Sequence, residues 1–382
     1  MPDAQTAILT IDLAAIAANY RYLVEQAAPA VCAAAVKADA YGLGAAMVAP
    51  VLYREGCKHF FVATVDEGLA LRQVLPNALI YVLNGLPPGA AAILASADLI
   101  PVLCTLEQIE DWRKFCATAG QPKPAALQID TGISRLGLPQ ADVVRLSTDP
   151  RLLRGFPIVH VMSHLACGDE PAHPMNDQQL MLFRTLTENF PWPTSGPTSG
   201  PKGGKPSFGM SASSGIFLGT DFHFDLVRPG AALYGLEPVS GRANPMRPVV
   251  RLQGKILQIR DVDLGMTVGY GATHRVEGPS RLATIGVGYA DGIFRSLGNR
   301  GAVFVAGERA PVVGRISMDL ITVDVGGVPR AALYPGAVVD IIGPEQSVDD
   351  FARSAGTIGY EILTAFGRRY QRRYLSDTRR AG

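Results

Sequence analysis

Eight short apolar runs recur between residues 31 and 235, and they constrain the fold of this chain more than any other feature. Segments with the length and apolar spacing of helices separate them. Strands that are covered by helices on both faces read as near-continuous apolar runs. Eight such strand and helix repeats predict a (β/α)8 barrel. The runs begin at Ala33, His59, Leu79, Leu99, Ala126, Ile158, Pro206 and Asp225.

The texture of the sequence changes after Gly235. Runs rich in Val, Ile and Gly follow, with turn signals and little helical periodicity. The boundary is expected in GLEPVSGRANPMRP, where Pro, Gly and polar residues cluster. We therefore predict an α/β fold with two domains, a (β/α)8 TIM-like barrel over residues 1–238 and a mostly-β domain over residues 239–382.

Composition and charge exclude several classes of function. The 35 basic and 34 acidic residues leave a net charge of +1, which provides no broad attraction for nucleic acid or an anionic membrane. No apolar run approaches the roughly 20 residues of a membrane helix, and the first residues lack the basic region of a secretory signal. The five scattered cysteines form no C-x-x-C pair, so we expect neither disulfides nor a metal site. We expect a cytoplasmic protein that acts on a small molecule.

Polar residues follow several of the predicted strands, at the end where such barrels build active sites. They are Lys37, Arg135, His164, Ser213 and Arg228. A lysine directly after a buried strand is costly unless it is paired or used chemically. In an apolar pocket its pKa falls, and the neutral amine can condense with an aldehyde. The residues alone leave two readings of Lys37 open, a Schiff-base lysine or a lysine that reaches solvent at the rim.

Two other patterns carry less information. His160 and His164 are four residues apart and could be metal ligands, but no third ligand is evident, and we favour ordinary packing for both. The stretch GVGYADG lacks the G-x-G-x-x-G order of a dinucleotide-binding loop.

The local sequence AVKADAYGLGA around Lys37 resembles the cofactor-lysine motif of alanine racemases, the fold type III pyridoxal-phosphate enzymes. The resemblance extends almost end to end, in family order. It implies pyridoxal 5'-phosphate as cofactor, interconversion of L-alanine and D-alanine, and a homodimer with shared active sites. The further blocks include IDTGISRLG from Ile129, SHLACGDEPAHP from Ser163, FDLVRPGAALYG from Phe224, VGYGATHRV from Val268 and GTIGYEILT from Gly356.

The resemblance assigns two bases to opposite faces of the substrate Cα, Lys37 on one face and Tyr270 on the other. A single base returns the proton to the face it left, unless the base or the substrate moves, so racemisation favours two. A hydrogen-bonded line from Tyr270 to His164 to Arg228 is implied to favour the phenolate. The same Arg228 is implied to face the pyridine nitrogen, where it disfavours protonation and limits side reactions.

The remaining site residues also come from the resemblance. Arg135 is implied to lie near the cofactor phenolic oxygen and the substrate carboxylate. In the β domain of the neighbouring subunit, three residues are implied to complete the site, although a plain turn and strand packing are alternatives for them. These three are Tyr289, Met318 and Asp319. Phosphate binding is implied for Tyr41, Ser213, Tyr360 and the backbone of Gly230 and Ala231.

This chain departs from the family pattern at three places. Gln128 stands where many members have a lysine that is often carbamylated, so Arg135 lacks that charge partner. Ala212 replaces a common asparagine, and we expect Ser213 rather than Ser214 to bind phosphate. The TSGP-rich segment PWPTSGPTSGPKGGKP from Pro191 is unusually long, holds nothing to bury, and is expected to be a mobile surface loop.

Several functional alternatives remain open at this stage. A broad-specificity, serine or basic amino-acid racemase would share the fold and the catalytic pair. A decarboxylase or aldolase would use the same lysine, but decarboxylases of this fold type usually present an acidic residue where Arg228 stands. A non-catalytic pyridoxal-phosphate-binding protein would lack the β domain. Supply of D-alanine as a peptidoglycan precursor and catabolism of L-alanine are both compatible with the sequence.

Overall fold

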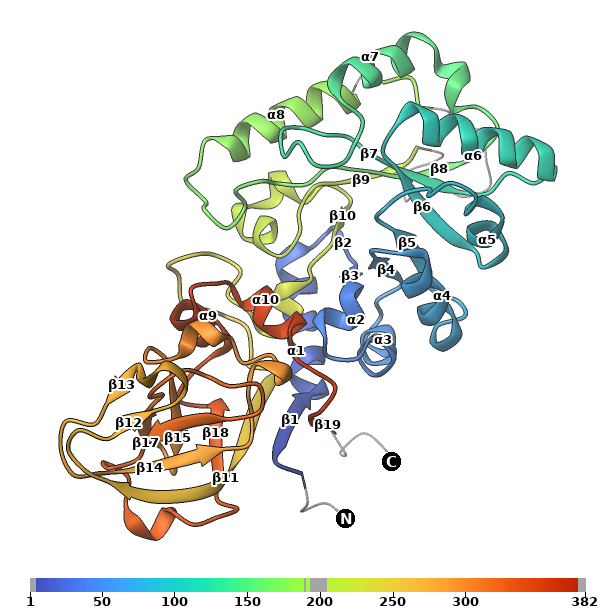
Figure 1. The fold of residues 1–382 in the computed structure, drawn as a ribbon. Helices are drawn as coiled ribbons and strands as arrows, with labels where there is room; N and C mark the ends of the chain where they lie inside the picture. The colour runs from blue at the N-terminus through green and yellow to red at the C-terminus, as the bar shows by residue number, and fades with distance from the viewer. Residues whose placement is uncertain (1–4, 189, 193–204, 377–382) are drawn as a thin grey trace. The chain divides into compact units, whose positions relative to one another are not determined.

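The computed structural model describes residues 5–188, 190–192 and 205–376, and the chain divides into two compact units (Figure 1). We call them the barrel unit and the β unit. The barrel unit comprises Ala17–Leu233 and Glu237–Met246, and the β unit comprises Met1–Ile16, Tyr234–Leu236 and Arg247–Gly382.

Parallel strands alternate with helices through the barrel unit, as the apolar runs predict. Seven of them form one sheet in the order β3-β4-β5-β6-β7-β8-β9, and β10 pairs in parallel with β2. The strands are β2 (Val31–Cys32), β3 (Ala34–Ala35), β4 (His59–Val62), β5 (Leu79–Val82), β6 (Leu99–Leu103), β7 (Ala125–Gln128), β8 (Ile158–Met162), β9 (Ser207–Gly209) and β10 (Leu226–Val227). The helices are α1 (Leu13–Ala27), α2 (Lys37–Tyr41), α3 (Ala45–Arg54), α4 (Val65–Val74), α5 (Ala91–Ser96), α6 (Leu106–Ala119), α7 (Gln140–Thr148) and α8 (Met175–Glu188).

Backbone hydrogen bonds on both sides of β10 close the barrel. The amide of Asp225 donates to the carbonyl of Phe208 in β9, and the carbonyl of Asp225 accepts from the amide of Val31. The last strand therefore lies between β9 and the first strand, which β2 and β3 form together. This closure confirms the barrel fold that the eight apolar runs predict.

Side chains from successive strands fill the centre of the barrel, as in other barrels of this class. Phe61 from β4 stacks on Tyr81 from β5, with ring centroids 4.5 Å apart. Because this interior is packed, the open positions for chemistry lie at the strand ends. The core cluster consists of Ala33, Ala35, Phe61, Tyr81, Ile100, Val102, Ala126, Met162 and Leu226.

The β unit is built on a mostly antiparallel sheet in the order β16-β15-β18-β11-β1-β19, with β14 joined to β11 and β17. This agrees with the Val/Ile/Gly-rich texture after Gly235. Its strands are β1 (Ala7–Asp12), β11 (Val250–Val262), β12 (Thr267–Val268), β13 (His274–Arg275), β14 (Ser280–Ile285), β15 (Ala302–Val305), β16 (Glu308–Pro311), β17 (Ile321–Asp324), β18 (Val338–Ile342) and β19 (Gln371–Leu375). Its helices are α9 (Val348–Ala355) and α10 (Gly359–Thr364).

The N-terminal segment differs from the expected division at residue 238. Strand β1 pairs antiparallel with β11, with Ala7 opposite Gly254, and parallel with β19, with Ile8 opposite Gln371. Both partner strands are far away along the chain, so no local sequence pattern predicts this pairing. The first residues therefore group with the β unit rather than with the barrel.

The TSGP-rich segment lies mostly outside the described residues, which omit 193–204. The expectation that this segment buries nothing is wrong for Trp192. Its indole Nε1 donates to the carbonyl of Thr187, and its buried ring lies 4.0 Å from that of Phe190. Elsewhere in the described chain, none of the helices has both the length and the hydrophobicity that a membrane crossing requires.

Candidate active site

Lys37 begins α2, immediately after the first barrel strand, and the four residues that follow it have left-handed backbone angles. Ala38 to Tyr41 have φ between 53° and 56°, and none of them is glycine. Left-handed helical geometry costs L-residues roughly 1–2 kcal/mol each. Two hydrogen bonds, Ala40 N to Val36 O and Gly42 N to Ala38 O, show that this is one turn of left-handed helix. Such strain persists only where the surroundings enforce it, and it often marks a functional site.

Burial and two guanidinium groups act on the charge of the Lys37 amine. Burial is the largest cause that lowers its pKa, followed by the positive charge of Arg135, while Glu67 opposes the shift and Arg228 adds to it. A lowered pKa increases the fraction of neutral amine, which is the nucleophilic and basic form. The environment of Lys37 thus favours the reactive form that the sequence analysis requires.

Arg228 is buried at the end of β10, where burial lowers its pKa to about 10. Its Nη2 donates to the carbonyl of Ser163 at 2.7 Å. Its Nη1 is buried and has no hydrogen-bond partner among the described residues. Because a buried unpaired donor costs about 1–3 kcal/mol, Nη1 is suited to an acceptor that the protein itself does not supply.

Backbone amides and hydroxyls converge beside Lys37. The Oγ of buried Ser213 accepts hydrogen bonds from the amides of Gly230 and Ala232, at 3.0 and 3.1 Å. The Tyr41 hydroxyl lies so close to Gly230 that there is no room for a Cβ at that position. Ala231 is buried between these two amides. With two amides donating to it, the Ser213 hydroxyl keeps its own hydrogen for an anion.

His164 follows β8 and is held by its backbone. Buried Gln179 on α8 donates from Nε2 to the carbonyl of His164 and to the hydroxyl of Thr131, while its Oε1 accepts from the amide of Ala166. The ring of His164 has a pKa lowered to about 3, first by its enclosure in the protein and then by the positive charge of Arg228. His164 is therefore neutral at physiological pH.

Gln128 binds a backbone carbonyl, whereas the lysine that many family members have at this position is implied to pair with Arg135. Its Nε2 donates to the carbonyl of Leu136 at 2.8 Å, and its side chain is buried. Arg135, the neighbour of Leu136, is exposed on the loop between β7 and α7. A neutral amide thus anchors the loop of Arg135 through the backbone.

Tyr270 lies in the β unit, on the turn between β12 and β13. Its side chain is 73% exposed. Glycines with positive φ stand on both sides of it, Gly269 at 74° and Gly271 at 73°. The turn rests on Arg315, because a Cβ at Gly269 would lie 3.2 Å from the Arg315 amide nitrogen. The fold thus presents a phenol to the surface on a supported turn.

Three other expected site residues meet on the same unit. The amide of Tyr289 donates to the carbonyl of Ser317, and the amide of Ala290 donates to that of Met318. Both Tyr289 and Met318 have exposed side chains. The turn of Tyr289 and the loop of Met318 therefore lie together, and the carbonyl of Met318 leaves no room for a Cβ at Gly288. We use the name platform for these two segments and the exposed turn of Tyr270 on the same unit.

Arg369 joins the turn of Tyr289 to the loop of Met318. Its Nε and Nη2 donate to the two carboxylate oxygens of buried Asp291, each at 2.7 Å. Its Nη1 donates to Asp319 at 2.6 Å. Asp319 is therefore held by an arginine of its own unit. Tyr360, the remaining expected phosphate ligand, lies on α10 of the β unit.

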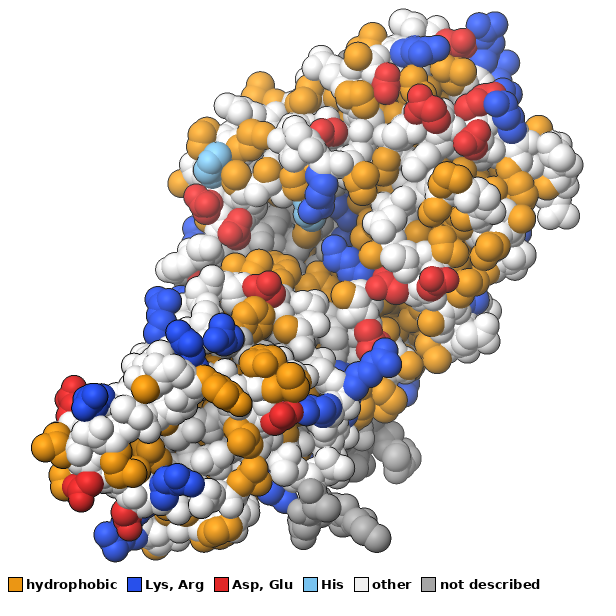
Figure 2. Space-filling model, viewed as in Figure 1, with side chains coloured by type: hydrophobic (Ala, Val, Ile, Leu, Met, Phe, Trp, Pro, Cys, Tyr) orange, Lys and Arg blue, Asp and Glu red, His pale blue; other side chains and the backbone are white. Residues whose placement is uncertain are grey.

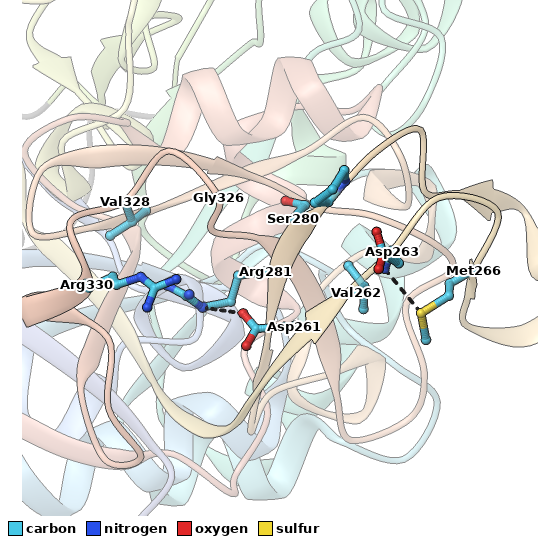
Figure 3. A pocket seen from close by; sticks show the side chains of 10 residues that line it. Asp261, Val262, Asp263, Met266, Ser280, Arg281, Gly326, Val328 and Arg330 are labelled. Atoms are coloured by element: carbon cyan, nitrogen blue, oxygen red, sulfur yellow. Dashed lines mark hydrogen bonds and ion pairs between the residues drawn. The ribbon is translucent and has the colours of Figure 1, made fainter.

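The β unit also contains a cavity of about 530 Å³ (Figure 3). The ion pair between Arg281 and Asp261, 3.0 Å long, lies along it, and Arg330 also lines it. None of the site residues expected from the sequence belongs to its lining. This cavity is therefore separate from the candidate site.

Sequence reasoning missed three residues that hold the site, namely Glu67, Gln179 and Arg369. Glu67 has a signal, since T-V-D-E from Thr64 matches the capping-box pattern that places a glutamate at the third helical position. Gln179 and Arg369 act over long sequence separations, and no local pattern marks them.

The fold and the site together define a (β/α)8-barrel protein with an appended β domain. A lysine and two arginines lie at the barrel rim, together with the hydroxyls of Ser213 and Tyr41 beside Gly230. A model of the N-terminal domain of alanine racemase matches residues 11–238, and a model of its C-terminal domain matches residues 249–374. The chain belongs to the alanine racemase family.

Individual relatives agree with this assignment. The chain is 51% identical to an alanine racemase of Rhodospirillum rubrum over 378 residues, which cover 97% of this chain and 96% of the relative. It is 42% identical to a crystal structure of alanine racemase from Bartonella henselae with covalently bound pyridoxal phosphate, with a TM-score of 0.91 over 97% of this chain and 99% of that one. An alanine racemase structure from Streptomyces coelicolor A3(2) is 34% identical, with a TM-score of 0.89 over 98% and 99% of the two chains.

Proposed function

We propose that this chain is a pyridoxal-phosphate-dependent racemase that interconverts L-alanine and D-alanine. Membership of the alanine racemase family supports the reaction. The observation that carries the proposal is the lowered pKa of Lys37 at the rim of the barrel, which burial and the charges of Arg135 and Arg228 produce.

The residues present fit pyridoxal phosphate. The hydroxyls of Ser213 and Tyr41 form an anion cradle beside Gly230 that is suited to the phosphate. The amides of Gly230 and Ala232 hold Ser213 in place by donating to its Oγ. The unpartnered Nη1 of Arg228 is suited to an acceptor such as the pyridine nitrogen. Lys37 would hold the aldehyde carbon. When bound, this cofactor supplies an electron sink that acidifies the Cα–H bond of an amino acid.

Two residues of the chain then move the proton. Lys37 takes it at Nζ on one face of the substrate Cα, and Tyr270 supplies or takes a proton at its phenolic oxygen on the other face. Arg135 binds the substrate carboxylate, for which a guanidinium is well matched. Neutral His164 and cationic Arg228 together favour charge on a phenolate brought near them. This division of labour accounts for reaction in both directions.

The second base comes from another copy of the chain. The exposed position of Tyr270 supports this part of the proposal, because a phenol on the surface of a supported turn is able to contact another chain. Hydrophobic side chains are visible among polar ones on the face of the β unit in Figure 2. A homodimer in which each β unit completes the site of the other would cover such residues. The exposed apolar side chains of the β unit include Leu264, Met266, Tyr270, Tyr289, Met318, Leu320 and Tyr334.

Borohydride reduction with peptide mapping tests the proposal, together with an assay of alanine racemisation. The pyridoxyl group is expected on Lys37, and both enantiomers of alanine are expected to be consumed. A label on another lysine would overturn the site, and absence of turnover with cofactor present would overturn the reaction. Comparison of kcat/KM for alanine, serine and lysine measures the substrate specificity, which depends on the shape of the pocket rather than on the two bases.

A further inference from the structure

We propose that Glu67 is a positioning residue for Lys37, because its carboxylate ties the amide that follows the lysine to the start of α4. Oε1 of Glu67 accepts a hydrogen bond from the amide of Ala38 at 2.7 Å. Oε2 accepts from the amide of Ala63 at 2.7 Å and from that of Thr64 at 3.4 Å. One carboxylate therefore joins two neighbouring strand ends of the barrel.

The strained turn explains why such a tie is needed. The left-handed residues begin at Ala38, the residue whose amide Glu67 binds. At the other end of the turn, Oδ1 of Asp39 accepts from the amide of Ala45 at 2.7 Å and fixes the exit to α3. Helix α4 lies beside α2, so the rigid capped end of α4 serves as the support. Without the bond to Ala38, the backbone at Lys37 is free to relax from a conformation that its residues disfavour.

The negative charge of Glu67 also acts on the pKa of Lys37. Among the charges that shift the pKa of Lys37, Arg135 and Arg228 lower it and Glu67 alone raises it. The carboxylate thus limits the repulsion that three cations would otherwise exert on one another. This effect adds to the positioning role, which rests on the hydrogen bonds.

The substitution Glu67→Gln separates the tie from the side chain's bulk. A carboxylate accepts with both oxygens, whereas an amide accepts with its oxygen and donates with its NH2 group. In either orientation, the new side-chain amide would set its NH2 against a backbone N–H, at Ala38 or at Ala63. Glu67→Gln therefore weakens the tie without leaving a cavity.

Hydrogen exchange of the full chain loaded with pyridoxal phosphate, read by mass spectrometry, tests the inference. Glu67→Gln is expected to speed exchange over residues 37–44 about tenfold, the effect of losing one charge-assisted hydrogen bond. Asp66→Asn removes the neighbouring carboxylate and is expected to leave residues 37–44 unchanged. Thr64→Ala removes the hydroxyl that caps α4 but keeps the Glu67 carboxylate, and it is expected to speed exchange over residues 64–74 more than over residues 37–44. Glu67→Asp keeps the charge on a shorter side chain and provides a second variant if the first does not fold.

Kinetics separate positioning from structural support. With Glu67→Gln, kcat for alanine is expected to fall about tenfold while KM stays within about twofold, because the change concerns proton transfer by Lys37. Unchanged exchange over residues 37–44 in both Glu67 variants would overturn the inference, and so would faster exchange with normal kcat. The inference rests on the proposed role of Lys37, but failure of that role is recognised separately, as a wild-type chain that does not racemise alanine.

Discussion

The barrel rim and the platform of the β unit present their functional groups in opposite ways. At the rim, Arg228 is buried, the pKa of Lys37 is lowered, and a donor of Arg228 has no partner among the described residues. On the platform, the side chains of Tyr270 and Met318 are exposed, and Arg369 is paired with Asp291 and Asp319. The rim is prepared for an anionic ligand, whereas the platform is prepared for contact with another surface.

This difference implies that neither region forms a complete racemase site by itself. The rim has a lysine and two arginines, but in the proposed mechanism Lys37 serves only one face of the substrate. The platform has a phenol and no group to hold a cofactor among the residues described above. We infer that catalysis depends on bringing a rim and a platform together, and the predictions below probe each side of that comparison.

The largest effect is expected at the rim, for Lys37→Ala. Loss of the amine removes both the covalent anchor for the cofactor and one base, so kcat should fall at least about 10³-fold. Lys114→Ala, which changes an exposed lysine on α6, is the matched control and should retain normal turnover. A Lys37→Ala variant with more than a tenth of wild-type activity would contradict the role of the rim.

On the platform, Tyr270→Phe should reduce racemisation by about 10²–10³-fold, because it removes one proton donor and keeps the ring. Lys37 would still exchange the α-proton of one enantiomer with solvent deuterium, so exchange should persist for one enantiomer and vanish for the other. Tyr334→Phe, at another exposed tyrosine of the β unit, is the control. Equal exchange for both enantiomers would show that Tyr270 is not the second base.

The fold follows from the sequence where local pattern is enough. Each apolar run of the barrel becomes a strand, and Gly120 ends α6 with φ of 65°, a left-handed conformation that glycine adopts easily. Pairing over long distances is not visible in this way. Strand β1 joins β11 and β19 because these strands leave matching edges, a property of the assembled sheet.

The site shows the same limit. The positions of Lys37, Arg228 and Ser213 near strand ends of the barrel could be predicted because each follows an apolar run. The left-handed turn after Lys37 could not, because its residues, Ala38–Tyr41, are not the glycines that usually announce positive φ. The groups that hold the site act from side chain to distant backbone or charge, as Arg369 does, and leave no local signature.

A moderate effect is expected from Arg369→Ala, which tests the support of the platform. The change leaves the buried carboxylate of Asp291 without its guanidinium, at a cost of about 2 kcal/mol in the free energy of unfolding. Arg151→Ala breaks an exposed ion pair with Asp149 and should change the free energy of unfolding far less, because water screens exposed pairs. Urea unfolding of both variants measures the difference. Equal losses of unfolding free energy would show that the pairing of Arg369 with Asp291 stabilises the platform no more than an exposed ion pair does.

The smallest effect concerns pH and the rim. The pKa of His164 is about 3 in the folded chain and about 6.5 in the unfolded chain, so unfolding takes up a proton between these values. Stability should therefore fall as pH decreases from about 6.5 toward 3, by at most about 1.4 kcal/mol per pH unit for this group. Partial exposure of His164 reduces that figure.

His164→Asn should flatten this fall, measured as the free energy of unfolding in urea at pH 7 and pH 5. His274→Asn, in the β unit, serves as the comparison. An unchanged pH dependence in His164→Asn would show that this ring does not titrate as its enclosure implies.

Mixing two inactive variants tests most directly whether rim and platform come from different copies of the chain. Lys37→Ala and Tyr270→Phe chains are unfolded together, refolded with cofactor, and assayed for alanine racemisation. If each site combines the rim of one chain with the platform of another, half of the dimers are hybrids and each hybrid has one intact site, which restores about a quarter of wild-type activity. If both bases come from the same chain, no site in the mixture has both, and activity will stay at the level of the separate variants.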